Sequence, residues 1–95
     1  MEWGSGGRLA AGLTHPPGAS AYYLGGLILP DAPEGDLRAE SVGRRLGADL
    51  VISLDGASRP PVLEITDLRA GRRAAAALTG PEVVDSLLAG LGLPA

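Results

Sequence analysis

The chain has 95 residues, a length that predicts one domain, residues 1–95, with a modest core. Its 11 acidic residues outnumber 8 basic ones, so the charge of −3 gives no basic stripe that would bind nucleic acid. Cysteine is absent and histidine occurs once, which excludes a disulfide framework, a thiolate nucleophile and an intrachain multi-histidine metal site. We expect no nucleic-acid partner, no metal and no other cofactor.

Neither a secretion signal nor a membrane span is predicted. The opening sequence MEWGSGGR lacks a basic segment followed by an apolar run. The longest mostly apolar stretch, residues 21–29, is far shorter than the ~20 residues that span a bilayer. These features predict a cytoplasmic protein with no membrane partner.

The first element predicted is a short helix over residues 5–13. Ser5 can cap it, and apolar residues recur there at spacings of three and four. Pro16 and Pro17 then end the helix, because proline cannot donate a backbone hydrogen bond. Residues 19–23 can form one helical turn after these prolines.

A continuous apolar run over residues 24–29 predicts a strand with both faces covered. The acidic, proline-rich segment 30–36 predicts a loop. Asp36 is placed to cap a helix over residues 37–46, and Gly47 is placed to end it.

Three further strands are predicted at residues 48–55, 60–68 and 72–79, from their apolar and β-branched content. Residues 69–71 read as a tight hairpin turn between the last two strands. The alanine-rich third strand is the weakest of these patterns, because alanine favours helix.

The C-terminal segment 79–92 predicts an amphipathic helix with Pro81 at its first helical position. Its apolar stripe consists of Val83, Val84, Leu87, Leu88 and Leu91. Helices and strands therefore alternate before a strand pair follows. We expect an α/β fold with a mixed sheet of about four strands and about three helices in two or three layers.

Two segments carry a family pattern. Its first part matches Glu2, Gly6 and Gly7, and its second part matches Leu13, Thr14, Pro17, Gly18, Ser20, Ala21, Tyr22, Gly25 and Gly26. Residues 44–60, RRLGADLVISLDGASRP, add Gly56 and Pro60. This set resembles the C-terminal domain of the competence/damage-inducible protein CinA, a family of bacterial nicotinamide-nucleotide amidases, and it implies that family's α/β fold.

The family's catalytic groups do not carry over. The resemblance implies that the family's serine falls on Trp3, its tyrosine on Pro30 and its lysine on Gly35, and the chain has no lysine at all. The region after Gly35 is also shorter than in the family. We therefore expect a truncated, degenerate relative with no catalytic residue.

Ser5, Gly6 and Gly7 stand at the start of the predicted first helix. Their backbone amides could bind a phosphate at the positive end of the helix dipole. An N-cap in which the glycines allow close packing is the simpler interpretation of the same three residues.

The loop after the strand at 48–55 lies where α/β folds place ligands. In this loop, which contains Gly56 and Ser58, Arg59 could pair with a phosphate or a carboxylate. The alternative is an ordinary turn with a solvated arginine. Ser20 could be a nucleophile with His15 as its base, although a surface histidine is the simpler interpretation.

Asp31, Glu34 and Asp36 could bind a hard cation or be a solvated connection. Trp3 could stack on a ligand ring, or lie in a subunit interface that covers an exposed sheet edge.

Three functions fit these patterns. The first is a catalytically degenerate homo-oligomer with a structural, binding or regulatory role. The second is a binding module for a nucleotide or other small anionic ligand, and an active amidase is a third alternative. The ligand-binding candidates are Ser5, Gly6, Gly7, Ser20, Gly56, Ser58 and Arg59.

Overall fold

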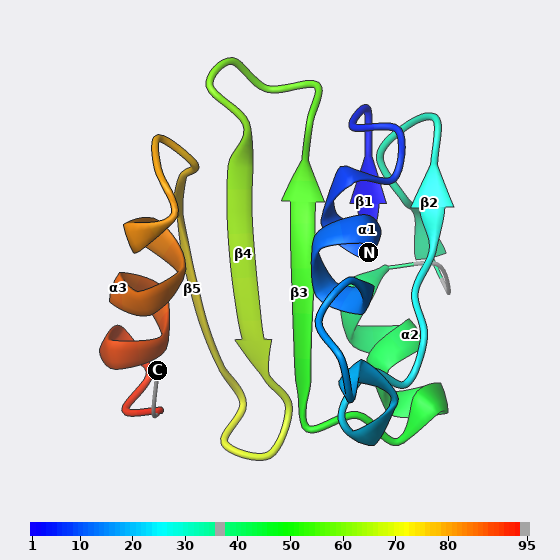
Figure 1. Cartoon of the computed structure of the whole chain (residues 1–95), viewed down its shortest axis with the longest axis vertical. Coiled ribbons are helices and arrows are strands. Elements are labelled where there is room, and N and C mark those ends of the chain that lie inside the picture. The colour runs from blue at the N-terminus through cyan, green and yellow to red at the C-terminus, as the bar shows by residue number, and fades with distance from the viewer. Residues whose placement is uncertain (36–37, 94–95) are drawn as a thin grey trace.

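The computed structural model describes residues 1–35 and 38–93. It contains a five-stranded sheet in the order β2-β1-β3-β4-β5, with helices on both faces (Figure 1). The predicted α/β fold with a mixed sheet is confirmed, and the strand beyond the expected count is β1 (Glu2–Trp3). No helix in the described ranges is long and apolar enough to cross a membrane.

The sheet is parallel in its first half and antiparallel in its second. β1 pairs in parallel with β2 (Ile28–Leu29) and with β3 (Leu50–Asp55). β4 (Val62–Asp67) and β5 (Arg72–Ala77) then continue the sheet in antiparallel order. The carboxyl ends of β1, β2 and β3 therefore meet at one edge, where the three arrowheads point in Figure 1.

One face of the sheet carries the hydrophobic core. α1 (Arg8–Thr14) and α3 (Glu82–Gly90) lie on this face, as Figure 1 shows. Alternate residues of β3 and β4 point toward α3, because successive side chains of a strand face opposite sides. The buried cluster consists of Leu54, Leu63, Ile65, Leu87 and Leu91.

α2 (Ala39–Leu46) covers part of the opposite face. A side chain at its buried residue Gly43 would collide with the side chains of Val51 and Leu68, so glycine lets the helix approach the sheet closely. Gly47 has φ +70° and ends α2, as its sequence position predicts.

The hairpin predicted around residues 69–71 is confirmed. Buried Asp67 accepts hydrogen bonds from the backbone nitrogens of Arg69 at 3.0 Å and Ala70 at 3.1 Å. Gly71 completes the turn with φ +68°. An aspartate that bonds its own following backbone is a common way to close a turn.

Some predicted boundaries are wrong. The expected strand over 24–29 is reduced to β2, because the neighbouring β1 has only two residues, which pair with Ile28 and Leu29. The helical turn predicted at 19–23 is present as the 3₁₀ turn η1 (Ala19–Ala21).

The helix starts also differ from the expectation. Gly7, not Ser5, is the residue before α1, and Pro81 precedes α3 instead of opening it. α2 follows Arg38, and the cap predicted at Asp36 lies outside the described residues.

Candidate functional site

Two loops touch at the edge where the parallel strands end. A Cβ on Gly4 would lie 2.8 Å from the Ala57 nitrogen, and one on Gly56 would lie 2.7 Å from the Gly4 carbonyl carbon. The Gly56 nitrogen also donates to the Trp3 carbonyl at 2.7 Å. Only glycine at both positions allows this backbone approach.

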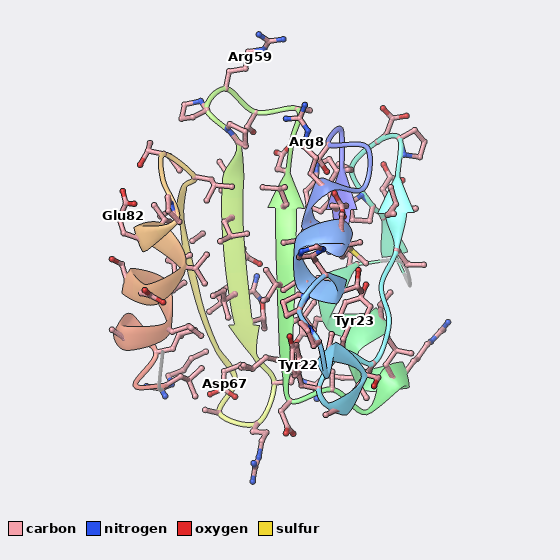
Figure 2. All side chains as sticks on the ribbon, in the orientation of Figure 1. Arg8, Tyr22, Tyr23, Arg59, Asp67 and Glu82 are labelled. Atoms are coloured by element: carbon pink, nitrogen blue, oxygen red, sulfur yellow. The ribbon has the colours of Figure 1, made fainter. Side chains whose placement is uncertain are left out.

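A cavity of about 590 Å³ opens beside this contact, and we call it the loop-edge cavity. Its apolar walls come from α1, β3 and the segments flanking β4 and β5. They consist of Leu9, Leu13, Leu54, Pro61 and Leu78. Gly4, Ser5, Gly12 and Gly56 complete the lining, together with Arg8, the only charged side chain among the described lining residues. Figure 2 places Arg8 beside the end of β3.

A buried carboxylate organises the start of α1. Glu2 is 1% exposed. One of its oxygens accepts from the Ser5 hydroxyl at 2.6 Å and from the Leu9 nitrogen at 3.1 Å. The other accepts from the Ala10 nitrogen at 2.7 Å. Glu2 therefore supplies the cap that the sequence assigned to Ser5.

The environment of Glu2 keeps it ionised. Burial raises the pKa of Glu2, but hydrogen bonds from Ser5, Ala10 and Leu9 together outweigh burial and lower the pKa below its ordinary value. An anion approaching the amides of α1 would meet this carboxylate. The backbone amides of Leu9 and Ala10, in the first turn of α1, are therefore already bonded to Glu2. A phosphate at the site predicted around Ser5–Gly7 could not use these two amides.

A second carboxylate, at the last residue of β3, is satisfied by the loop that follows it. Asp55 accepts from the Ala57 nitrogen at 3.0 Å, the Ser58 nitrogen at 3.2 Å and the Ser58 hydroxyl at 2.8 Å. The Ser58 hydroxyl lowers the pKa of Asp55 most, and the backbone bonds and Trp3 lower it further against the effect of burial. Ser58 thus holds the turn together.

The remaining predicted site residues lie elsewhere. Arg59 is exposed at the tip of the β3–β4 loop and points away from the body of the molecule (Figure 2). Ser20 is exposed in η1, at the opposite end of the sheet from the loop edge (Figure 1). His15, exposed at the end of α1, has no hydrogen bond to Ser20 among the described contacts.

Two members of the predicted set, Ser5 and Gly56, line the same cavity, and Gly6 and Gly7 belong to the adjoining loop. Asp31 and Glu34 are exposed, while Asp36 lies outside the described residues. Within the part of the chain that the structure describes, no three acidic or histidine side chains converge in a way that could hold a metal ion.

Sequence reasoning missed Arg8 and the role of Glu2. An acid shortly before a glycine-rich helix start was the available signal for Glu2, since helix starts favour negative charge. No family model, curated protein or solved structure matches this chain. The resemblance to the amidase family therefore stays a prediction.

Proposed function

We propose that this chain is a non-catalytic binding protein that takes a small anionic ligand in the loop-edge cavity and self-associates. One observation carries the proposal: Arg8 is the only charged side chain among the described residues that line an otherwise mainly apolar cavity. Such a cavity favours a ligand with one anionic group on a largely apolar body.

The chemistry of the lining defines the ligand class. The Arg8 guanidinium can hold a phosphate or carboxylate through paired hydrogen bonds. Leu9, Leu54 and Leu78 offer apolar surface to a planar base or another ring. The volume of about 590 Å³ lies within the usual range for small-molecule sites. Nicotinamide mononucleotide supplies two of the matching groups, a phosphate for Arg8 and a planar ring for the leucines, joined by a polar ribose.

The geometry around Ser5 supports binding without hydrolysis. A serine becomes a nucleophile when a neighbouring base takes its proton. The Ser5 hydroxyl donates to Glu2, whose lowered pKa makes it a weak base and whose two oxygens accept further bonds from backbone nitrogens. The absence of lysine removes the residue that the amidase family would require.

Self-association has separate support from an exposed apolar surface. The exposed large apolar residues are Tyr22, Leu24, Ile28, Leu46 and Leu50. All but Ile28 line one hollow between residues 21–27, α2 and the start of β3. Contiguous apolar surface of this kind marks interaction sites. Light scattering should show an oligomer that Leu24→Asp dissociates, and a monomeric parent protein would overturn this part of the proposal.

Ligand binding is tested by calorimetric titration with nicotinamide mononucleotide. Arg8→Gln should weaken binding about tenfold or more, the loss expected for a charge-assisted hydrogen bond. Arg59→Gln is the matched control and should leave affinity unchanged, because Arg59 points away from the cavity. Equal losses in both variants, or no binding by the parent protein, would contradict the proposal.

A further inference from the structure

A second cavity, of about 510 Å³, lies on the face of the sheet that α2 covers. We call it the α2-face cavity, and its lining is unlike that of the loop-edge cavity. Its polar residues come from the sheet and from the start of α2: Arg38, Glu40, Ser53, Asp55, Glu64, Thr66 and Arg73. Trp3, Val62 and Pro33 contribute apolar surface.

The strand register places the polar side chains together. Ser53 pairs directly with Glu64, and Thr66 pairs with Arg73 on the next strand. Because side chains alternate along a strand, these positions share the face opposite the hydrophobic core. Ser53 and Thr66 are nevertheless only 5% and 6% exposed. This face therefore buries two hydroxyl groups, which stabilise a fold less than buried apolar side chains would.

Ser53 has an unmet hydrogen-bonding capacity. Its hydroxyl oxygen is the one buried side-chain polar atom, among the described residues, that has no hydrogen-bond partner. A buried hydroxyl without a partner destabilises the fold, so native proteins contain few of them. An unpaired hydroxyl in the lining of a cavity indicates a ligand that completes its bonding.

Two opposite charges in the lining are also unpaired. Within the described chain, neither the Glu64 carboxylate nor the Arg38 guanidinium takes part in a side-chain hydrogen bond or an ion pair. The other charges are engaged: Arg73 lies 3.9 Å from Glu40, and Asp55 is bonded within its own turn. A half-buried carboxylate and an exposed guanidinium, neither with a side-chain partner among the described residues, thus line the same cavity.

From these groups we infer that the α2-face cavity binds an amino-acid zwitterion with an apolar side chain. The ligand's ammonium would donate to the Glu64 carboxylate and the Ser53 hydroxyl. Its carboxylate would accept from Arg38, and its side chain would contact Trp3 and Val62. This site lies across the sheet from the core face and takes a different ligand, so it does not depend on the proposed function.

Trp3 provides a direct readout, because it is the only tryptophan of the chain and it lines this cavity. Titration with L-leucine should change Trp3 fluorescence saturably. N-acetyl-L-leucine, which lacks the ammonium, and L-leucinamide, which lacks the carboxylate, should each bind about tenfold more weakly or worse. No fluorescence change with L-leucine, or equal affinity for all three compounds, would overturn the inference.

Variants tie the binding to the named groups. Glu64→Gln and Arg38→Gln should each weaken L-leucine binding about tenfold, whereas Asp85→Asn on α3 should not. Ser53→Ala should weaken binding and raise the Tm of the free protein, because it removes the unpaired hydroxyl. A structural role alone would not predict these opposite effects. Unchanged affinity in Glu64→Gln and Arg38→Gln would refute the site.

Discussion

The two halves of the chain are held together differently. Six of the seven buried apolar residues among the described ones lie between Val51 and Leu91, where β3, β4, β5 and α3 pack. Only Ala19 comes from the first half. The C-terminal half is therefore stabilised mainly by packing of apolar side chains, the usual source of stability in small domains.

The N-terminal half relies on hydrogen bonds. β1 and β2 have two residues each, and α1 has no buried residue. Backbone bonds tie β1 to its neighbours, from Glu2 to Leu27 and from Leu54 to Met1, both at 2.9 Å. The Glu2 carboxylate then holds α1. Hydrogen bonds to one buried carboxylate thus fix the helix of this half, whereas a buried apolar cluster fixes the helix of the other.

The largest expected effect comes from the packed half. Ile65 is 0% exposed, and Ile65→Ala should lower the free energy of unfolding by about 3 kcal/mol. Ile28→Ala, at a residue that is 56% exposed, should cost less than about 0.5 kcal/mol. Urea denaturation measures both values. Similar losses in the two variants would remove the distinction between the halves.

Glu2→Gln should cost about 2 kcal/mol, because the amide leaves a buried helix start without its charged acceptor. Hydrogen exchange should accelerate at the Leu9 and Ala10 amides while the β4 amides stay protected. Glu34→Gln, at an exposed residue, is the control. Uniform acceleration along the whole chain would show that the N-terminal half has no separate stability.

The same carboxylate predicts a pH dependence. The folded protein holds the pKa of Glu2 below its ordinary value of 4.5, so the unfolded chain takes up a proton first. The stability that Glu2 contributes is therefore present above pH 4.5 and lost as the pH falls through the lower folded pKa. Glu2→Gln should lose less stability than the parent protein over this acidic range.

Gly56→Ala should cost about 1 kcal/mol or more, because its Cβ would press against the Gly4 backbone and separate the two loops. Gly90→Ala in α3 has nothing within 4 Å of the added Cβ and should be neutral or stabilising. Thermal unfolding compares the two variants. An unaffected Gly56→Ala would mean that the loop contact contributes little.

The smallest effect should come from the surface of the N-terminal half. Arg44 lies 3.2 Å from Glu40 on α2, and both side chains are at least half exposed. Arg44→Gln should change stability by no more than about 0.3 kcal/mol, since exposed ion pairs are screened by water. A much larger loss in urea denaturation would show that surface pairs, rather than Glu2, support this half.

The sequence predicted the packed half well because its patterns are regular. The runs containing β3 and β4 and the apolar stripe of α3 all correspond to observed elements. Prediction was weaker where glycine and hydrogen bonds decide the structure. The strand expected over 24–29 shortens to Ile28–Leu29, because β1 offers only two residues for pairing. The cap assigned to Ser5 is made by Glu2 from a preceding strand.

The candidate site was predictable only in part. Ser5 was named because it stands at a glycine-rich helix start, and Gly56 because its loop follows a predicted strand; they do line one cavity. Arg8 was missed because a lone arginine in a helix has no distinctive pattern. Ser58 and Arg59 share a loop with Gly56. The Ser58 hydroxyl is bonded to Asp55 within the turn, and Arg59 at the loop tip points away from the cavity.

The most direct test of the account is to follow heat and ammonia release in one sample during titration with nicotinamide mononucleotide. We predict saturable heat with no ammonia, since Arg8 can hold the phosphate while Ser5 stays bonded to Glu2. Ammonia release by the parent protein that Ser5→Ala abolishes would contradict it and identify the chain as an amidase.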